Sequence, residues 1–104
     1  MITANEHGGL VMVHAENGDA IQVLQDRFAA AGDLGVAFWP RSRPPELETE
    51  AAHRAITLAG IVDAPLYIVH ISAAQTVEEV ARGRERGVAV YGETCPQYLS
   101  LIHI

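Results

Sequence analysis

Two short apolar stretches, residues 10–14 (LVMVH) and 65–70 (PLYIVH), decide the fold. Each is rich in β-branched or bulky apolar residues, which favour strands, and each is followed by a pattern of helical period. Both stretches end on a histidine, His14 in the first and His70 in the second. In parallel α/β folds the chemistry is built at the carboxyl ends of the strands. The two histidines are therefore candidate metal ligands or acid–base groups.

The chain between the two stretches predicts two helices. Asp19 is a plausible N-cap, and apolar residues recur after it at three- and four-residue steps, which predicts an amphipathic helix ending near Gly32. Residues 33–45 contain Gly35 and three prolines and are expected to form a loop. A second helix is expected to start near Glu46, in an acidic segment that suits a positive helix N-terminus, and Gly60 marks its end.

A third helix and a third strand complete the pattern. Ser72 with Gln75 resembles a capping box for a helix that carries Val77, Val80 and Ala81 and ends at Gly87. Residues 88–91 (VAVY) are expected to be the third strand. Strands that alternate with helices indicate an α/β fold with a parallel sheet and right-handed crossovers. Because three parallel strands make a poor fold alone, we expect the chain to be a slice of a larger α/β barrel.

Composition narrows the class of protein. The 104 residues are 49% hydrophobic and 19% charged, with a net charge of −6, which indicates one small globular domain or part of a larger one. The scattered basic residues do not predict nucleic-acid binding. The sequence lacks a membrane-length apolar run and a signal-peptide pattern, and the single Cys95 excludes an internal disulfide. We therefore expect a soluble cytoplasmic protein.

His14 and His70 lie too far apart in sequence for a local zinc-finger spacing, so any connection between them is spatial. Neighbouring strands of a barrel bring the residues at their carboxyl ends to one rim. Neutral imidazole is a good ligand for zinc and similar divalent ions. The alternative for each is a hydrogen-bonded rim histidine without a metal.

Other polar residues have weaker patterns. Glu16 and Asp19 are candidates to orient the imidazole of His14, or else a turn residue and a helix cap. Glu93 ends the third strand and is a candidate catalytic carboxylate, although such residues are common in βα loops. Cys95 has no basic neighbour and is interpreted as a structural thiol rather than a nucleophile.

The remaining candidates are arginines and histidines. Arg41 and Arg43 lie in the proline-rich loop and are candidates to contact an anionic substrate, or else surface groups. His7, His53 and His103 have no partner pattern, and His53 is expected on a helix surface.

Five ordered blocks, covering about Gly9 to Leu99, resemble the dihydropyrimidinase/hydantoinase family of cyclic amidohydrolases. They are residues 13–19 (VHAENGD), 42–44 (SRP), 50–56 (EAAHRAI), 66–72 (LYIVHIS) and 92–99 (GETCPQYL). The Gln in CPQYL favours this branch, because allantoinases tend to have His there. The resemblance implies a (β/α)8 TIM-type barrel, with this chain covering about strands five to seven.

The resemblance also implies a function. Family members are zinc-dependent hydrolases that open dihydropyrimidines and hydantoins to N-carbamoyl amino acids, and they are often homotetramers. Two divalent metals, usually zinc, are bridged by a carboxylated lysine and a hydroxide. On this basis His14 and His70 bind the same, more buried metal.

Several family residues have no counterpart here, namely a His-x-His, the bridging lysine and a catalytic aspartate. We therefore expect no catalytic residue within this chain and an inactive polypeptide by itself. The alternatives are an allantoinase piece, a non-catalytic scaffold of the same fold, or an inert fragment. Residues 1–98 are expected to be part of the barrel domain, whereas residues 99–104 (LSLIHI), which include His103, resemble the translation of a sequencing adapter.

Overall fold

The computed structural model describes residues 1–101 and contains one three-stranded parallel sheet. The predicted α/β class is confirmed, and the strands stand in sequence order across the sheet. Residues 102–104, including His103, lie outside the described part of the chain. The strands are β1 (Val11–Val13), β2 (Leu66–Ile68) and β3 (Val90–Gly92).

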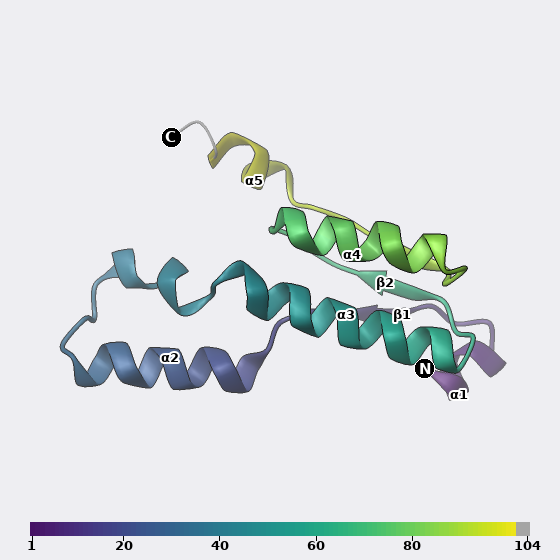
Figure 1. Ribbon diagram of the computed structural model, residues 1–104, viewed down its shortest axis with the longest axis horizontal. Coiled ribbons are helices and arrows are strands. Elements are labelled where there is room, and N and C mark those ends of the chain that lie inside the picture. The colour runs from purple at the N-terminus through teal and green to yellow at the C-terminus, as the bar shows by residue number, and fades with distance from the viewer. Residues whose placement is uncertain (102–104) are drawn as a thin grey trace.

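Helices surround the carboxyl end and one face of this sheet (Figure 1). The structure adds two short helices at the ends of the described chain that the sequence patterns did not predict, and the predicted loop 33–45 contains two 3-10 turns. The helices are α1 (Ile2–Glu6), α2 (Gly18–Ala30), the 3-10 turns η1 (Val36–Phe38) and η2 (Pro40–Ser42), α3 (Pro45–Ile61), α4 (Ala74–Glu85) and α5 (Pro96–Leu101). None of the described helices combines the length and apolar character needed to cross a bilayer.

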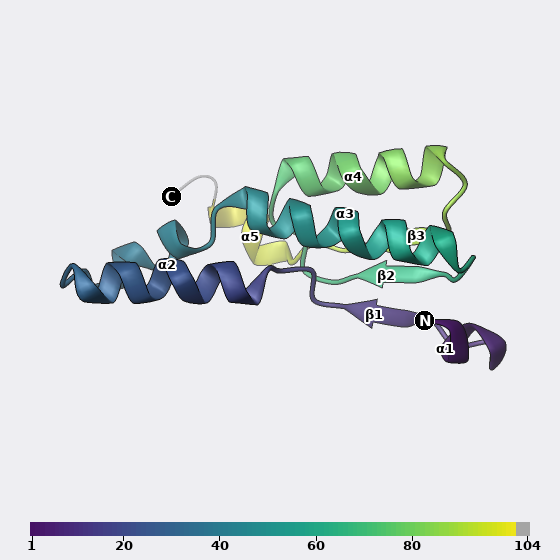
Figure 2. The same ribbon diagram turned by 60° about the horizontal axis from the view of Figure 1, so that its bottom comes forward.

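Only one face of the sheet is covered. Helices α3 and α4 lie side by side on it, whereas α2 extends beyond the carboxyl end of the strands (Figure 2). The core between helices and sheet is built from small and branched side chains, among them Ile56, Leu66, Ile68 and Val90. On the opposite face Met12 is 61% exposed and Tyr91 is 48% exposed. In residues 1–101 no helix covers that face.

The boundaries of the strands differ from the predicted ones. Strands β1 and β2 are shorter, so that His14 follows β1 by one residue and His70 follows β2 by two. The third strand begins at Val90 rather than at Val88, because the Val88 amide donates to the Gly83 carbonyl at the end of α4. That hydrogen bond keeps Val88 in the turn between helix and strand.

Both predicted helix caps are wrong. Helix α2 is capped by Asn17, whose side-chain oxygen accepts from the Ala20 amide at 3.1 Å, and Asp19 stands inside the first turn. Helix α4 begins after Ala73 without a capping side chain of its own, so the Ser72–Gln75 capping box does not form. The reason is that the Ser72 hydroxyl donates to a carboxylate on α3.

The predicted apolar stripe of α4 is only partly right. Val80 packs against the core, but Val77 is 57% exposed and Ala81 is exposed. The buried positions of this helix are Thr76, Glu79 and Gly83. Helix α4 lies close to α3 at Gly83, where a Cβ atom would stand 2.7 Å from Cγ2 of Ile56.

A polar network joins α3 to α4. Glu79 is buried and accepts from His53 Nδ1 at 2.8 Å and from Arg82. His53 is on the surface as expected, but its ring has a partner that the sequence did not reveal. The hydrogen bond from His53, together with the Arg82 charge, holds the pKa of Glu79 below its usual value even though burial opposes this.

We expect the Gly83→Ala variant to be destabilised by about 1 kcal/mol. Alanine favours a helix interior by about 1 kcal/mol over glycine, but overpacking against Ile56 and Val90 costs about 1–3 kcal/mol. Urea unfolding measures the difference. The matched control is Gly18→Ala at the start of α2, where a Cβ would meet no atom within 4 Å and stability should change by less than about 0.5 kcal/mol. Equal stability of the two variants would contradict the close packing of α4 on α3.

The Glu79→Gln variant should lose about 1–2 kcal/mol of unfolding free energy near neutral pH, because it removes charge-assisted hydrogen bonds. Since the pKa of Glu79 is depressed in the folded chain, its stabilisation is present above the ordinary carboxyl pKa and is lost as pH falls through the depressed value. Urea unfolding at a series of pH values should therefore show the two proteins converging in acid. Glu78→Gln, which removes an exposed partner of Arg82, should show a smaller and flatter difference.

Candidate metal centre

His14 and His70 meet at the carboxyl end of the sheet. Nδ1 of His14 lies 2.6 Å from Nε2 of His70, and the ring centroids are 4.7 Å apart with the planes inclined at 45°. Parallel pairing of β1 with β2 sets this meeting, because Val13 stands opposite Ile68 and the two strands end together. One ring nitrogen donates a proton to the other, in a direction that the tautomers decide.

His70 has an unusual backbone conformation, with φ at +45°. A non-glycine residue in the left-handed region costs about 1–3 kcal/mol and persists only where its surroundings impose it. Here the amide before His70, that of Val69, donates to the Val13 carbonyl of β1 at 3.1 Å. The amide after it, that of Ile71, donates to the Glu93 carbonyl beyond β3 at 2.8 Å. The turn is thus held from both neighbouring strands.

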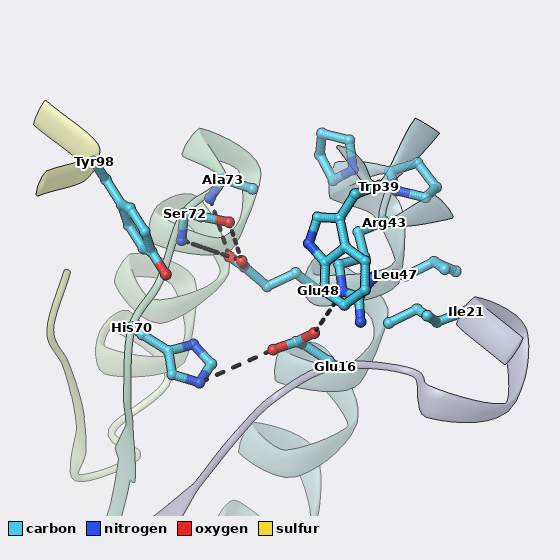
Figure 3. A pocket seen from close by; sticks show the side chains of 12 residues that line it. Glu16, Ile21, Trp39, Arg43, Leu47, Glu48, His70, Ser72, Ala73 and Tyr98 are labelled. Atoms are coloured by element: carbon cyan, nitrogen blue, oxygen red, sulfur yellow. Dashed lines mark hydrogen bonds and ion pairs between the residues drawn. The ribbon is translucent and has the colours of Figure 1, made fainter. Parts of the chain in front are cut away.

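Glu16 lies between His70 and the proline-rich segment (Figure 3). Its Oε1 is 3.9 Å from Nε2 of His70, and its Oε2 is 3.9 Å from Nε of Arg43. Arg43 in turn stacks on Trp39, with the guanidinium carbon 3.6 Å from the ring centroid. The structure therefore places Glu16 beside His70, rather than beside the His14 imidazole that it was a candidate to orient. Asp19 does not line this place.

A pocket of about 280 Å³ opens beside His70. Sequence reasoning found three of its lining residues and missed others that come from distant segments. Those missed include Trp39, Glu48, Ser72 and Tyr98. The sequence indicated Glu48 as an acidic residue in the first turn of α3. That pattern predicted a role at the N-terminus of its own helix and not in this pocket.

The other predicted candidates have other partners. Arg41 lies 5.2 Å from the ring centroids of both Phe28 and Phe38 and does not line the pocket beside His70. Glu93 accepts a hydrogen bond from the Tyr67 hydroxyl at 2.8 Å, and this bond raises the pKa of Tyr67.

Cys95 is half-buried, and its carbonyl accepts from the amide of Tyr98, which lines the pocket, at 2.9 Å. Burial, and after it Cys95, raises the pKa of Tyr98. His7 is exposed in the turn after α1, outside the pocket.

Among residues 1–101, the two imidazoles are the pair of potential metal ligands in direct contact at this place. Within residues 1–101 no group of three or more His, Cys, Asp or Glu side chains is placed to hold a metal ion. The histidine pair therefore offers two ligands on one side of a potential site, with Glu16 nearby as a charged neighbour.

Comparison with known proteins gives these residues a context. The chain is 52% identical over 101 residues to a D-hydantoinase of Streptomyces coelicolor, covering 97% of this chain and 22% of that protein. The crystal structure of dihydropyrimidinase from Brevibacillus agri superposes with a TM-score of 0.92 at 51% identity, over 94% of this chain and 21% of that one. The chain is homologous to the D-hydantoinase and dihydropyrimidinase family. It spans about a fifth of the length of these relatives.

The matches also include an allantoinase. An allantoinase of Deinococcus radiodurans is 38% identical over 99 residues, 95% of this chain and 22% of that protein. No family model matches the chain. The D-hydantoinase of S. coelicolor thus exceeds this allantoinase in identity, in agreement with the branch that the CPQYL block predicts.

We expect His70→Gly to be more stable than His70→Ala by about 1 kcal/mol, because only glycine enters the left-handed region without steric cost. Urea unfolding measures both variants, and each lacks the ring. Val69→Gly and Val69→Ala are the control pair at a position that is not left-handed, and there alanine should be the more stable. The same order of stability at both positions would contradict the left-handed turn.

Proposed function

We propose that this chain contributes part of the active site of a metal-dependent cyclic amidohydrolase, which hydrolyses the ring amide of hydantoins or dihydropyrimidines to N-carbamoyl amino acids. One observation carries the proposal. The imidazole nitrogens of His14 and His70 converge at the carboxyl ends of adjacent parallel strands, in a chain about half identical to a D-hydantoinase. In α/β barrels this end of the strands holds the active site.

We place the chain at about strands five to seven of a (β/α)8 barrel, with residues 1–98 as the barrel part and residues 99–104 outside it. The uncovered side of the sheet supports this placement. Met12, Tyr67 and Tyr91 form a row across that side in register, and in a closed barrel such a row faces the packed interior. Helices α3 and α4 then belong to the outer ring.

The histidine pair fits a divalent metal by its chemistry and approximately by its geometry. Zinc prefers imidazole nitrogens at about 2.0–2.1 Å in tetrahedral sites, which separates two ligand nitrogens by about 3.3 Å. The nitrogens of His14 and His70 are 2.6 Å apart, so the rings need to open by less than about 1 Å. We propose zinc as this ion and a binuclear centre in the whole enzyme, with the remaining ligands from outside residues 1–101.

The chain's own residues have defined tasks in this proposal. A bound divalent ion supplies Lewis-acid chemistry, polarising the amide carbonyl and lowering the pKa of a coordinated water. His14 and His70 bind in their neutral form, each directing one lone pair to the ion. Glu16, 3.9 Å from His70, adds negative charge beside the site. The ion pair with Arg43 partly neutralises this charge. We expect this chain alone to be inactive, since it brings only two ligands together.

A graft tests the function. We expect the S. coelicolor D-hydantoinase, with its aligned 101 residues replaced by those of this chain, to open hydantoin and to contain zinc. In this graft His14→Ala or His70→Ala should lower kcat/KM more than about a hundredfold and reduce bound zinc, because a ligand is lost. Ring opening is followed by the N-carbamoyl product, and zinc by elemental analysis.

His7→Ala is the matched control, since it removes an exposed histidine outside the pocket and should change neither activity nor zinc content. Full activity and zinc in the His14→Ala graft would refute the metal role. A graft that binds zinc but opens allantoin in preference to hydantoin supports the allantoinase alternative. A folded graft without any hydrolysis supports the scaffold alternative.

A further inference from the structure

Glu48 makes a concentrated set of hydrogen bonds outside its own helix. It stands in the first turn of α3, and both of its carboxylate oxygens accept from the Ser72 amide at 3.1 Å. The Ser72 hydroxyl donates to the same carboxylate at 2.5 Å, and the Ala73 amide donates at 3.1 Å. Figure 3 shows this carboxylate directed at the segment that follows His70.

This contact caps α4 from another helix. The first amides of a helix have no partner within it, and they carry the positive end of the helix dipole. Helix α4 has no capping side chain of its own, and Ala73, its N-cap residue, offers none. The Glu48 carboxylate supplies both the acceptor and the negative charge. A carboxylate on α3 therefore fixes where α4 begins.

The same contact bears on His70, which precedes Ser72 by two residues. The backbone on either side of the left-handed turn is held by backbone hydrogen bonds to Val13 and Glu93 and by the buried side chain of Ile71. The carboxylate of Glu48 also accepts hydrogen bonds from the Ser72 and Ala73 amides. Glu48 and His70 also line the same pocket. Loss of the Glu48 contact frees the Ser72 and Ala73 amides. The strained turn then depends on its contacts with β1 and with the segment after β3.

We propose that Glu48 is a positioning residue for His70: by holding the backbone of Ser72 and Ala73, it maintains the left-handed turn that directs the His70 imidazole at His14. This rests on the proposed metal role of the two histidines. Glu48 makes no hydrogen bond or ion pair with either imidazole. It acts on His70 through the backbone of Ser72 and Ala73.

Glu48→Gln tests the proposal in the full 104-residue chain, because glutamine keeps the size of the side chain but loses an acceptor and the charge. We expect its zinc affinity to fall about tenfold, the scale for residues that orient a ligand. Zinc chloride titration is followed by NMR of the His14 and His70 rings. In the metal-free chain, a strong nuclear Overhauser effect between the His70 amide proton and its own Hα marks the positive φ. The variant should lose this signal.

Glu46→Gln is the matched control. It removes the same charge from the same first turn of α3, yet Glu46 is exposed and does not contact Ser72 or Ala73. Its zinc affinity and its His70 signals should match those of the unchanged chain. If Glu48→Gln fails to fold by circular dichroism, Ser72→Ala replaces it, since that variant removes one donor and keeps both amides. A weakening of about twofold is then expected.

The outcomes separate two failures. If Glu48→Gln lowers the unfolding free energy but retains the zinc affinity and the His70 signals of Glu46→Gln, the carboxylate serves only to stabilise α4 and the proposal is overturned. If the unchanged chain binds no zinc at its histidines, the graft decides the proposed metal role, because the remaining ligands come from outside residues 1–101. The metal-free His70 signals then still decide whether Glu48 positions the turn.

Discussion

The parallel pairing of β1 with β2 is the constraint on which the rest of the structure depends. With Val13 opposite Ile68, both strands end at one edge, and the residues beyond them fall side by side. The shift of one strand by a single residue exchanges its buried and exposed side chains, so packing of α3 against Leu66 and Ile68 also protects the arrangement of the histidines. Stability and site geometry therefore rest on the same register.

Local patterns predicted the main elements of this fold, because strands and helices differ in the spacing of their apolar residues. The sequence alone located the two strands ending near His14 and His70 and the helices between them, with errors of a few residues at the ends. The short helices α1 and α5 escaped prediction because their five and six residues are too few to show a helical period. The exposure of Val77 escaped it because the buried positions of α4 include Glu79 and Gly83, which an apolar pattern does not select.

Site residues could be predicted only where a residue's own position in the sequence indicates its role. Position at the end of a strand was enough to select His14 and His70, and adjacency in sequence was enough to suggest Glu16. Glu48 was beyond reach, since its partners lie 24 and 25 residues away and its acidic character already had a local explanation. The capping-box pattern at Ser72 misled for the same reason: a distant carboxylate accepts the hydrogen bond from the Ser72 amide that the local pattern assigned to Gln75.

The separation of the two histidines along the chain has a consequence for folding. Helices α3 and α4 and strands β2 and β3 are close in sequence and can associate early, whereas β1 must close a loop of about fifty residues to join them. The histidine pair is thus completed by the strand pairing that closes the longer loop. An ion bound by both rings would close that loop. It would therefore lower the conformational entropy of the unfolded chain, as a cross-link does, in addition to its role in the folded chain.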